Sequence, residues 1–320
     1  MAKLGVSFYP HGLTYRNAAT YGKLAEDQGF DSVFVVEGGV NNDAMAMTQA
    51  IAMATHHITV GTGIANLYFR HPATLGAGAV AIDELSDGRF ILGIGVNHPG
   101  MLGSIGITWR NPREALRETT DWLHNVFAGE TPPGIHTPFR AAAHPIPIHF
   151  AGIALETAEL SGEIADGLMC YLISKARYQD VIARVQRGAE KAGRPMQEIE
   201  VSVLLPTFLS EDLAEARAAA RRFLRFYLSV SVYQKMLRRS GFAAEIDGVM
   251  QAVSSGRPED VDRFITDRLM DELCLVGPRS RCHERLAELA EAGVTYPVVA
   301  PQVVEGETAA EVRRVLETFK

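Results

Sequence analysis

Residues 60–72 read VGTGIANLYFRHP, and this stretch decides the fold. Its first residues complete an apolar run, Thr59–Gly63, with the length and composition of a buried strand. A loop follows, and Pro72 stands where the first turn of a helix would begin. A strand, a loop and a helix in immediate succession predict one β/α unit.

The same unit recurs along the chain. Apolar strand-like runs alternate with stretches of helical period, and several runs are apolar at consecutive positions, as in a parallel sheet covered on both faces. The expected strands are Leu4–Phe8, Ser32–Val36, Thr59–Gly63, Phe90–Gly93, Ile146–Phe150, Leu168–Leu172, Glu200–Pro206 and Tyr296–Ala300. The loop after the first strand has no GxGxxG turn, which is typical of open dinucleotide-binding sheets. We therefore expect a single domain over residues 1–320, folded as a (β/α)8 TIM barrel.

One segment is too long for a simple crossover. Residues 210–277, between the seventh and eighth expected strands, are mostly helical by pattern. Long insertions after a barrel strand lie at the C-terminal mouth of the barrel, where active sites are built. We therefore expect a helical insertion that takes part in shaping a substrate site.

Composition excludes several classes of protein. The net charge of −7 disfavours nucleic acid as a partner, because phosphate binding requires a basic face. No apolar run reaches the roughly 18 residues of a membrane span, and the start, MAKLGVSFYP, lacks the pattern of a secretory signal. Cys170, Cys274 and Cys282 fit no metal or redox spacing. We expect a cytoplasmic protein without structural metal whose partner is a small organic molecule.

The opening stretch continues into a small-residue helix, ATLGAGAVAIDELSDGR, and a further strand and loop, FILGIGVNHP. This block resembles the bacterial luciferase-like superfamily of flavin-dependent monooxygenases and deazaflavin-dependent reductases, in particular its methylenetetrahydromethanopterin reductase-like members. The resemblance covers most of the chain and is strongest over residues 29–97, 146–171 and 286–300. It implies an oxidoreductase that holds FMN or coenzyme F-420 at the mouth of the barrel, and it implies a homodimer.

The resemblance also assigns residues around the cofactor ring. Gly63 and Ile64 would form a non-proline cis peptide whose bulge backs the ring, and Asn66 would hydrogen-bond the ring or the ribityl chain. Glu37 matches an acidic residue that members carry after the second strand, which implies a catalytic carboxylate at the ring site. Gly38 stands where members often have a histidine.

Two further loops would complete the site. After the fourth strand, Asn97 would contact the cofactor. His98 is the candidate for proton transfer, because the ordinary pKa of histidine lies near neutrality. After the fifth strand, the backbone N–H groups of Gly152, Ile153 and Ala154 would bind the cofactor phosphate at a helix N-terminus.

Other assignments stay open in the sequence. Glu156 stands where deazaflavin-using members often have a lysine, so the choice between FMN and coenzyme F-420 is not made. The turn Gly277–Arg281 is a second candidate for the phosphate, or an ordinary helix start with Ser280 as its cap. Arg70 and His71 are interpreted as structural, the first as an ion pair and the second as an orienting residue before Pro72.

Two chemistries compete within the resemblance. One is hydride transfer between reduced coenzyme F-420 and an organic substrate, and the other is oxygen activation by reduced FMN. An alternative of another class is a non-catalytic barrel subunit or small-ligand-binding protein with a degenerate cofactor site, since Gly38 and Glu156 depart from the family pattern. A metal-dependent hydrolase is disfavoured, because the first strand carries no His-x-His pair.

Overall fold

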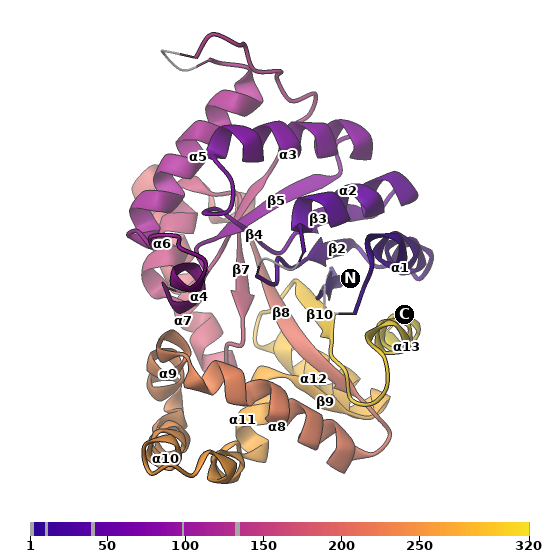
Figure 1. The fold of residues 1–320 in the computed structure, drawn as a ribbon, viewed down its shortest axis with the longest axis vertical. Helices are drawn as coiled ribbons and strands as arrows, with labels where there is room; N and C mark the ends of the chain where they lie inside the picture. The colour runs from indigo at the N-terminus through magenta and orange to yellow at the C-terminus, as the bar shows by residue number, and fades with distance from the viewer. Residues whose placement is uncertain (1–2, 10–11, 40–41, 98, 132–134, 320) are drawn as a thin grey trace.

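Parallel strand pairing closes the sheet into a barrel (Figure 1). The computed structural model describes residues 3–9, 12–39, 42–97, 99–131 and 135–319. Eight strands pair in the order β10-β1-β2-β3-β5-β6-β7-β8, and β8 pairs with β10 to complete the circle. All of these pairings are parallel. The predicted (β/α)8 barrel is therefore confirmed.

The strands agree closely with the expected ones. They are β1 Gly5–Phe8, β2 Ser32–Val35, β3 Thr59–Thr62, β4 Ala65–Asn66, β5 Phe90–Gly95, β6 Ile148–Ala151, β7 Gly167–Tyr171, β8 Glu200–Leu209, β9 Leu275–Gly277 and β10 Pro297–Pro301. Two of them were not predicted. β4 is a two-residue pairing with β5, and β9 pairs with the last residues of β8.

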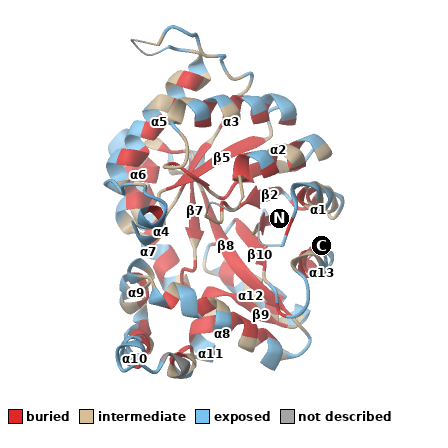
Figure 2. Cartoon of the chain, viewed as in Figure 1, coloured by how far each residue is buried: buried red, intermediate tan, exposed pale blue. Residues whose placement is uncertain are grey.

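Helices follow the strands and surround the barrel (Figure 1). They are α1 Tyr15–Asp27, α2 Ala44–Ala54, α3 Pro72–Ser86, α4 Pro99–Ser104, α5 Pro112–Ala128, α6 Leu155–Ile164, α7 Lys175–Ala192, α8 Leu213–Ser229, α9 Ser231–Leu237, α10 Ala243–Ser254, α11 Asp267–Leu273, α12 Arg279–Glu291 and α13 Thr308–Phe319. The strands are buried, whereas the helices present exposed residues to the outside (Figure 2).

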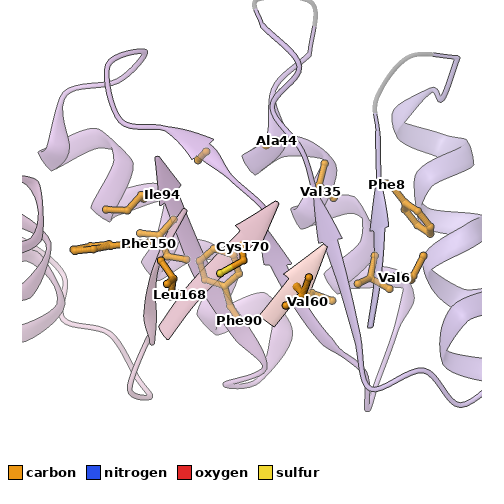
Figure 3. Packing of buried hydrophobic residues seen from close by; sticks show 14 of the residues in the cluster. Val6, Phe8, Val35, Ala44, Val60, Phe90, Ile94, Phe150, Leu168 and Cys170 are labelled. Carbon is orange, nitrogen blue, oxygen red and sulfur yellow. The ribbon is translucent and has the colours of Figure 1, made fainter. Parts of the chain in front are cut away.

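Side chains along each strand point alternately to the inside and to the outside of the barrel, and they form two apolar layers. On β2, Val33 and Val35 belong to the large cluster between sheet and helices, whereas Phe34 belongs to a smaller cluster built from strand residues or their immediate flanks. Because neighbouring strand residues point to opposite faces, this smaller cluster fills the inside of the barrel. We call it the lumen cluster; it consists of Phe34, Ile91, Met169, Leu204, Tyr296 and Val298. Figure 3 shows side chains of the outer layer, among them Val6 and Phe150.

The insertion lies between β8 and β10, as expected. α8, α9, α10 and α11 gather at one side of the barrel and bury an apolar core of their own (Figure 1). The last residues of the insertion are not helical, because Leu275–Gly277 forms β9 and pairs with β8. The three-residue run is too short to be distinguished from the helical pattern around it.

Candidate active site at the barrel mouth

The loop after β3 bends at the Gly63–Ile64 peptide bond, which is cis, as the family resemblance implied. Backbone hydrogen bonds hold both sides of the bend: Gly63 N donates to Val35 O at 2.8 Å, and Glu37 N donates to Ile64 O at 3.1 Å. A Cβ on residue 63 would lie 2.9 Å from Cβ of Phe34, so the approach requires glycine. Ile64 is half-buried and packs on the lumen cluster, at the C-terminal end of the barrel.

The carboxylate of Glu37 is fully buried behind this bend. Its Oε2 accepts from Asn66 N at 2.6 Å and from Arg70 Nη1 at 3.1 Å. Its Oε1 accepts from Arg70 Nη2 at 2.7 Å and from Ala44 N at 3.3 Å. A carboxylate has about four acceptor positions, and these four donors occupy them. The contacts therefore make Glu37 a positioning residue, and its predicted catalytic role stays a prediction.

Asn66 is completely buried next to the bend. Its backbone N–H is held by Glu37, and its Oδ1 accepts from Tyr68 N at 3.0 Å. Its Nδ2 has no hydrogen-bond partner among the described residues. Buried donors are rarely left unpaired, so this amide fits an acceptor that comes from outside the chain.

The residues after Asn66 support the loop. Arg70 bridges Glu37 and Asp43, which caps α2 by accepting from Ala46 N at 3.1 Å. Burial alone would lower the pKa of Arg70, but the hydrogen bonds and charges of Glu37 and Asp43 raise it well above its usual range. His71 caps α3, with Nδ1 accepting from Ala73 N at 3.2 Å. These contacts agree with the structural roles expected for Arg70 and His71.

The loop after β5 lies at the same end of the barrel. Asn97 is exposed and has a positive φ of 55°, a conformation that asparagine tolerates better than most residues. His98 lies outside the described residues. The predicted roles of both residues therefore stay predictions.

The turn after β6 forms the start of α6. Gly152 N donates to Met169 O at 3.3 Å, and Ala154 is the N-cap of α6, with no side-chain hydrogen bond to the cap. An uncapped helix start offers backbone N–H groups and a partial positive charge to an anion. Glu156, which stands where deazaflavin-using members often have a lysine, is exposed.

A cation that sequence analysis missed lies against this turn. Arg177 on α7 is 6% exposed, and its Nη2 donates to Ile153 O at 3.2 Å. Its Nε has no partner among the described residues. Burial lowers the pKa of Arg177; the charge of Asp180, 3.7 Å from Nη1, raises it, Arg239 from the insertion lowers it, and Glu156 raises it. A buried guanidinium with an unpaired N–H, close to a helix start, favours an anion at this place.

The signal for Arg177 was present in the helical pattern. Arg177 shares one face of α7 with the buried residues Val181 and Val185. An arginine on the buried stripe of an amphipathic helix needs a partner inside the protein. The pattern does not tell which partner, because Ile153 lies on the preceding β/α unit.

In the second phosphate candidate, Gly277–Arg281, the charge of Arg281 is already paired. Arg281 donates to Asp271 Oδ2 at 2.7 Å, inside a cavity of about 460 Å³ that is lined by equal numbers of acidic and basic side chains. No side chain caps α12, so the interpretation of Ser280 as a cap was wrong.

The described part of the chain holds neither a metal site nor a membrane span. No group of three or more His, Cys, Asp or Glu side chains there is arranged to hold a metal ion. Within the same residues, every helix is too short or too polar to span a lipid bilayer. The three cysteines are buried and form no disulfide bond.

Comparison with known proteins agrees with this geometry. The family model for luciferase-like monooxygenases matches residues 3–296. The chain belongs to this family. The predicted family, and the predicted enzyme class of flavin- or deazaflavin-type oxidoreductases, are therefore confirmed.

Individual members of the luciferase-like family resemble the whole chain. A 5,10-methylenetetrahydromethanopterin reductase of Methanolobus tindarius is 29% identical over 310 residues, which cover 93% of this chain and 94% of the relative. The solved coenzyme F-420-dependent tetrahydromethanopterin reductase of Methanopyrus kandleri has a TM-score of 0.81 at 21% identity, covering 99% of this chain and 98% of that one. The oxygenating constituent of 3,6-diketocamphane monooxygenase of Pseudomonas putida, solved with FMN, has a TM-score of 0.71 at 17% identity, covering 99% and 95%.

Proposed function

We propose that this luciferase-like protein is a coenzyme F-420-dependent oxidoreductase that transfers hydride to or from a small organic substrate. The observation that carries the proposal is the buried Asn66 amide, unpaired among the described residues, beside the cis bend at Ile64. A deazaflavin ring carries carbonyl oxygens and ring nitrogens that accept hydrogen bonds. The donor at Asn66 and the apolar surface of Ile64 fit such a ring.

The phosphate of the cofactor is assigned to the Gly152–Ala154 turn. The uncapped start of α6 and the buried Arg177 supply donors and positive charge there. When bound, the cofactor supplies the hydride chemistry, while the chain binds, orients and shields it. Glu37 fixes the loop that carries Ile64 and Asn66.

Likeness to known reductases favours coenzyme F-420 over FMN. The 29% identity with a methylenetetrahydromethanopterin reductase extends over nearly the whole of both chains. FMN remains the competing cofactor, because the same fold holds FMN in a monooxygenase. We further propose a cytoplasmic location and a homodimer, in keeping with the three buried cysteines that form no disulfide bond and with the family resemblance.

Cofactor titration tests the proposal. The purified chain is titrated separately with coenzyme F-420 and with FMN, and binding is followed by the change in cofactor fluorescence. We expect coenzyme F-420 to bind in the micromolar range or tighter, a free energy of about −8 kcal/mol. Failure of both cofactors to bind more tightly than about 1 mM would overturn the proposal. Tighter binding of FMN than of coenzyme F-420 would favour the FMN-dependent monooxygenase reaction over hydride transfer.

A variant separates the phosphate site from the ring site. Arg177→Met is expected to weaken the binding of coenzyme F-420 by roughly tenfold or more, because a charge-assisted hydrogen bond to the phosphate is lost. The same variant should bind the phosphate-free deazaflavin nucleoside as the wild type does. Arg184→Met on the same helix is the control, since Arg184 pairs with Glu159 and is 40% exposed. Equal losses for both ligands would refute the assignment of the phosphate to this turn.

A further inference from the structure

The segment after β5 stands apart from the core, although it lies at the mouth of the barrel. It comprises α4, Pro99–Ser104, and the residues that lead to Arg110, and we call residues 99–110 the mouth segment. Most of it is exposed, including the large apolar side chains of Ile105 and Trp109. Burial therefore does not fix its structure, as it fixes that of the barrel strands.

Two contacts place the mouth segment across the loops of the ring site. Near its start, Cε of Met101 lies 3.2 Å from where a Cβ on Gly39 would stand, in the loop after β2. At its end, the hydroxyl of Tyr68, in the loop after β3, donates to Arg110 O at 3.1 Å. Those two loops carry the buried carboxylate and the cis bend. The mouth segment thus lies beside the place assigned to the cofactor ring.

One side chain fastens α4 to the rest of the protein. Leu102 is fully buried, and it is the one buried residue among the six of α4, all of which the structure describes. It stands outside the three apolar clusters of the described chain. Next to it, a Cβ on Gly103 would find no atom within 4 Å. A helix with a single buried anchor belongs to the part of a fold that opens most easily.

The local sequence of α4 adds little stability. Three of its six residues, PGMLGS, are proline or glycine, and so short a helix is not stable by itself. Asn97 before it has a φ of 55° and Gly106 after it a φ of 78°, and both residue types tolerate this conformation. Ile107 N donates to Leu102 O at 2.9 Å and closes the last turn. The helix can therefore swing as a small unit once Leu102 leaves its place.

We propose that the mouth segment is a lid that closes on the bound cofactor, with Leu102 as the side chain that holds it shut. This inference rests on the proposed function, because it takes a ring beside Ile64 as what the lid covers. It adds a conformational step and a positioning residue. Closure of a lid excludes water from a site, which strengthens the electrostatic interactions there and prevents side reactions.

Hydrogen exchange followed by mass spectrometry tests the lid in the wild type. Without cofactor, the amides of residues 101–107 should exchange quickly, since a single side chain opposes local opening. Saturating coenzyme F-420, or FMN if that is the cofactor that binds, should slow their exchange by roughly tenfold or more, as binding to the closed form allows. Residues 193–198, a largely exposed turn before β8 at the opposite end of the barrel, are the control and should not change. Unchanged exchange of residues 101–107 would overturn the inference.

Leu102→Ala tests the anchor. Release of the cofactor, measured by stopped-flow fluorescence, should become roughly tenfold faster, while the association rate changes little, as is usual when a contact that holds a ligand is lost. Leu102→Met keeps an apolar side chain of similar volume and should restore slow release. The urea midpoint of Leu102→Ala should fall only slightly, because the lid opens locally instead of leaving a cavity in the core.

Leu116→Ala is the matched control. Leu116 on α5 is equally buried but belongs to the large cluster between sheet and helices. Its loss should lower the urea midpoint clearly and leave the release rate of the cofactor unchanged. If Leu102→Ala lowered the midpoint as much and left the release rate unchanged, Leu102 would be an ordinary core residue, and the lid would be refuted.

The two proposals fail separately. Normal affinity for coenzyme F-420 or FMN, without slower exchange of residues 101–107, would remove the lid and leave the proposed function intact. Failure of the wild type to bind either cofactor would overturn the proposed function, and with it the ring that the lid is proposed to cover.

Discussion

The guanidinium of Arg70 binds the carboxylate of Glu37 through two hydrogen bonds: Nη2 donates to Oε1 at 2.7 Å, and Nη1 donates to Oε2 at 3.1 Å. The pair links the loop after β2 to the loop after β3, on either side of the cis bend. Arg70→Met should lower the free energy of unfolding by about 3–5 kcal/mol, because it leaves the buried carboxylate without its counter-charge. Urea unfolding followed by circular dichroism measures the loss.

Arg110→Met is the control for this prediction. Arg110 pairs with Glu118, but both side chains are more than half exposed. Such a surface pair contributes about 1 kcal/mol or less. If the two variants lost similar stability, the Arg70–Glu37 pair would not be the anchor of the site.

Asn66→Leu should affect the cofactor more than the fold. The substitution removes an amide that is unpaired among the described residues and one hydrogen bond to the Tyr68 backbone, at a cost of about 1–2 kcal/mol of stability. Affinity for the cofactor should fall by roughly tenfold, since the donor to the ring is lost. Ser202→Ala, which removes another unpaired buried group near the opposite end of the barrel, should leave that affinity unchanged. A fall in both variants would disprove the assignment.

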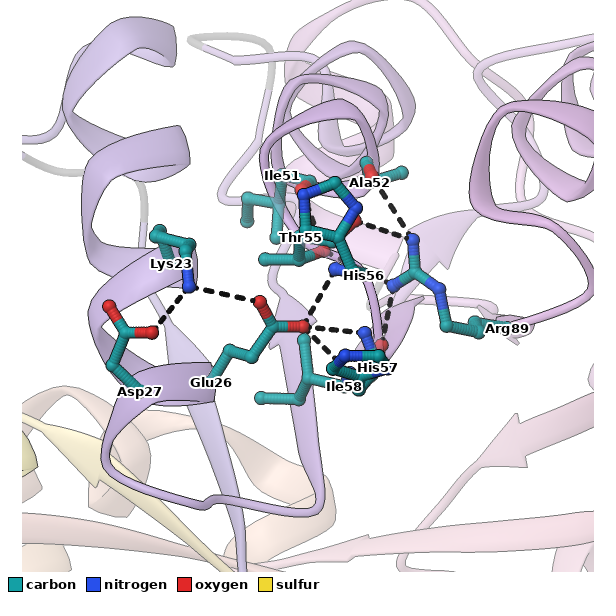
Figure 4. A network of polar contacts seen from close by, with 10 residues as sticks. All are labelled: Lys23, Glu26, Asp27, Ile51, Ala52, Thr55, His56, His57, Ile58 and Arg89. Atoms are coloured by element: carbon teal, nitrogen blue, oxygen red, sulfur yellow. Dashed lines mark hydrogen bonds and ion pairs between the residues drawn. The ribbon is translucent and has the colours of Figure 1, made fainter.

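Glu26 makes stability depend on pH. Its Oε1 accepts from the backbone N–H groups of His56, His57 and Ile58 at 2.7, 2.6 and 3.1 Å (Figure 4). Burial alone would raise the pKa of Glu26, but these donors together with Lys23 lower it to about 2. Because the folded pKa lies below the unfolded one, the stabilisation is complete above about pH 4.5 and is lost as the pH falls toward about 2.

Glu26→Gln removes that dependence. Its stability should be lower than that of the wild type at pH 7, and the difference should shrink steadily as the pH falls from about 4.5 to about 2. Urea unfolding at a series of pH values measures it. A difference that stays constant over this range would contradict the role of the three backbone donors.

The packing of α6 on α7 requires a residue without a side chain. A Cβ on Gly188 would lie 1.9 Å from Glu159 O, a backbone atom that cannot rotate away. Gly188→Ala should therefore cost about 1–3 kcal/mol, in spite of the better helix propensity of alanine. Gly103→Ala in α4, where nothing lies within 4 Å, should be neutral or slightly stabilising. Thermal melting of both variants checks the contrast, and equal melting temperatures would contradict it.

The sequence predicted the barrel because its strands are buried on both faces. Runs such as Phe90–Gly95 and Leu168–Tyr171 are apolar at successive positions, which makes them visible without structural knowledge. β4 and β9 were not predicted, because a run of two or three residues is too short to show the alternation of a strand. Their pairing depends on contacts with β5 and β8. The resemblance located the cis bend at Gly63–Ile64.

Contacts between distant units were beyond the reach of the sequence. Arg177 meets Ile153 across 24 positions, and Tyr9 meets Tyr171 across 162. Each residue by itself fits an ordinary helix face or strand end. Only closure of the barrel brings them together, so neither the anion site nor the contact between Tyr9 and Tyr171 has a local pattern.

β8 pairs directly with β10 over five residues, from Pro297–Val203 to Pro301–Thr207, although about 90 residues of chain separate the two strands. The chain thus leaves the barrel after β8 and returns to it at the neighbouring strand β10. The pairing of these two strands closes the barrel, and the helices between them take no part in that pairing. A change in the length of this segment therefore need not open the barrel or move the loops after β3 and β6.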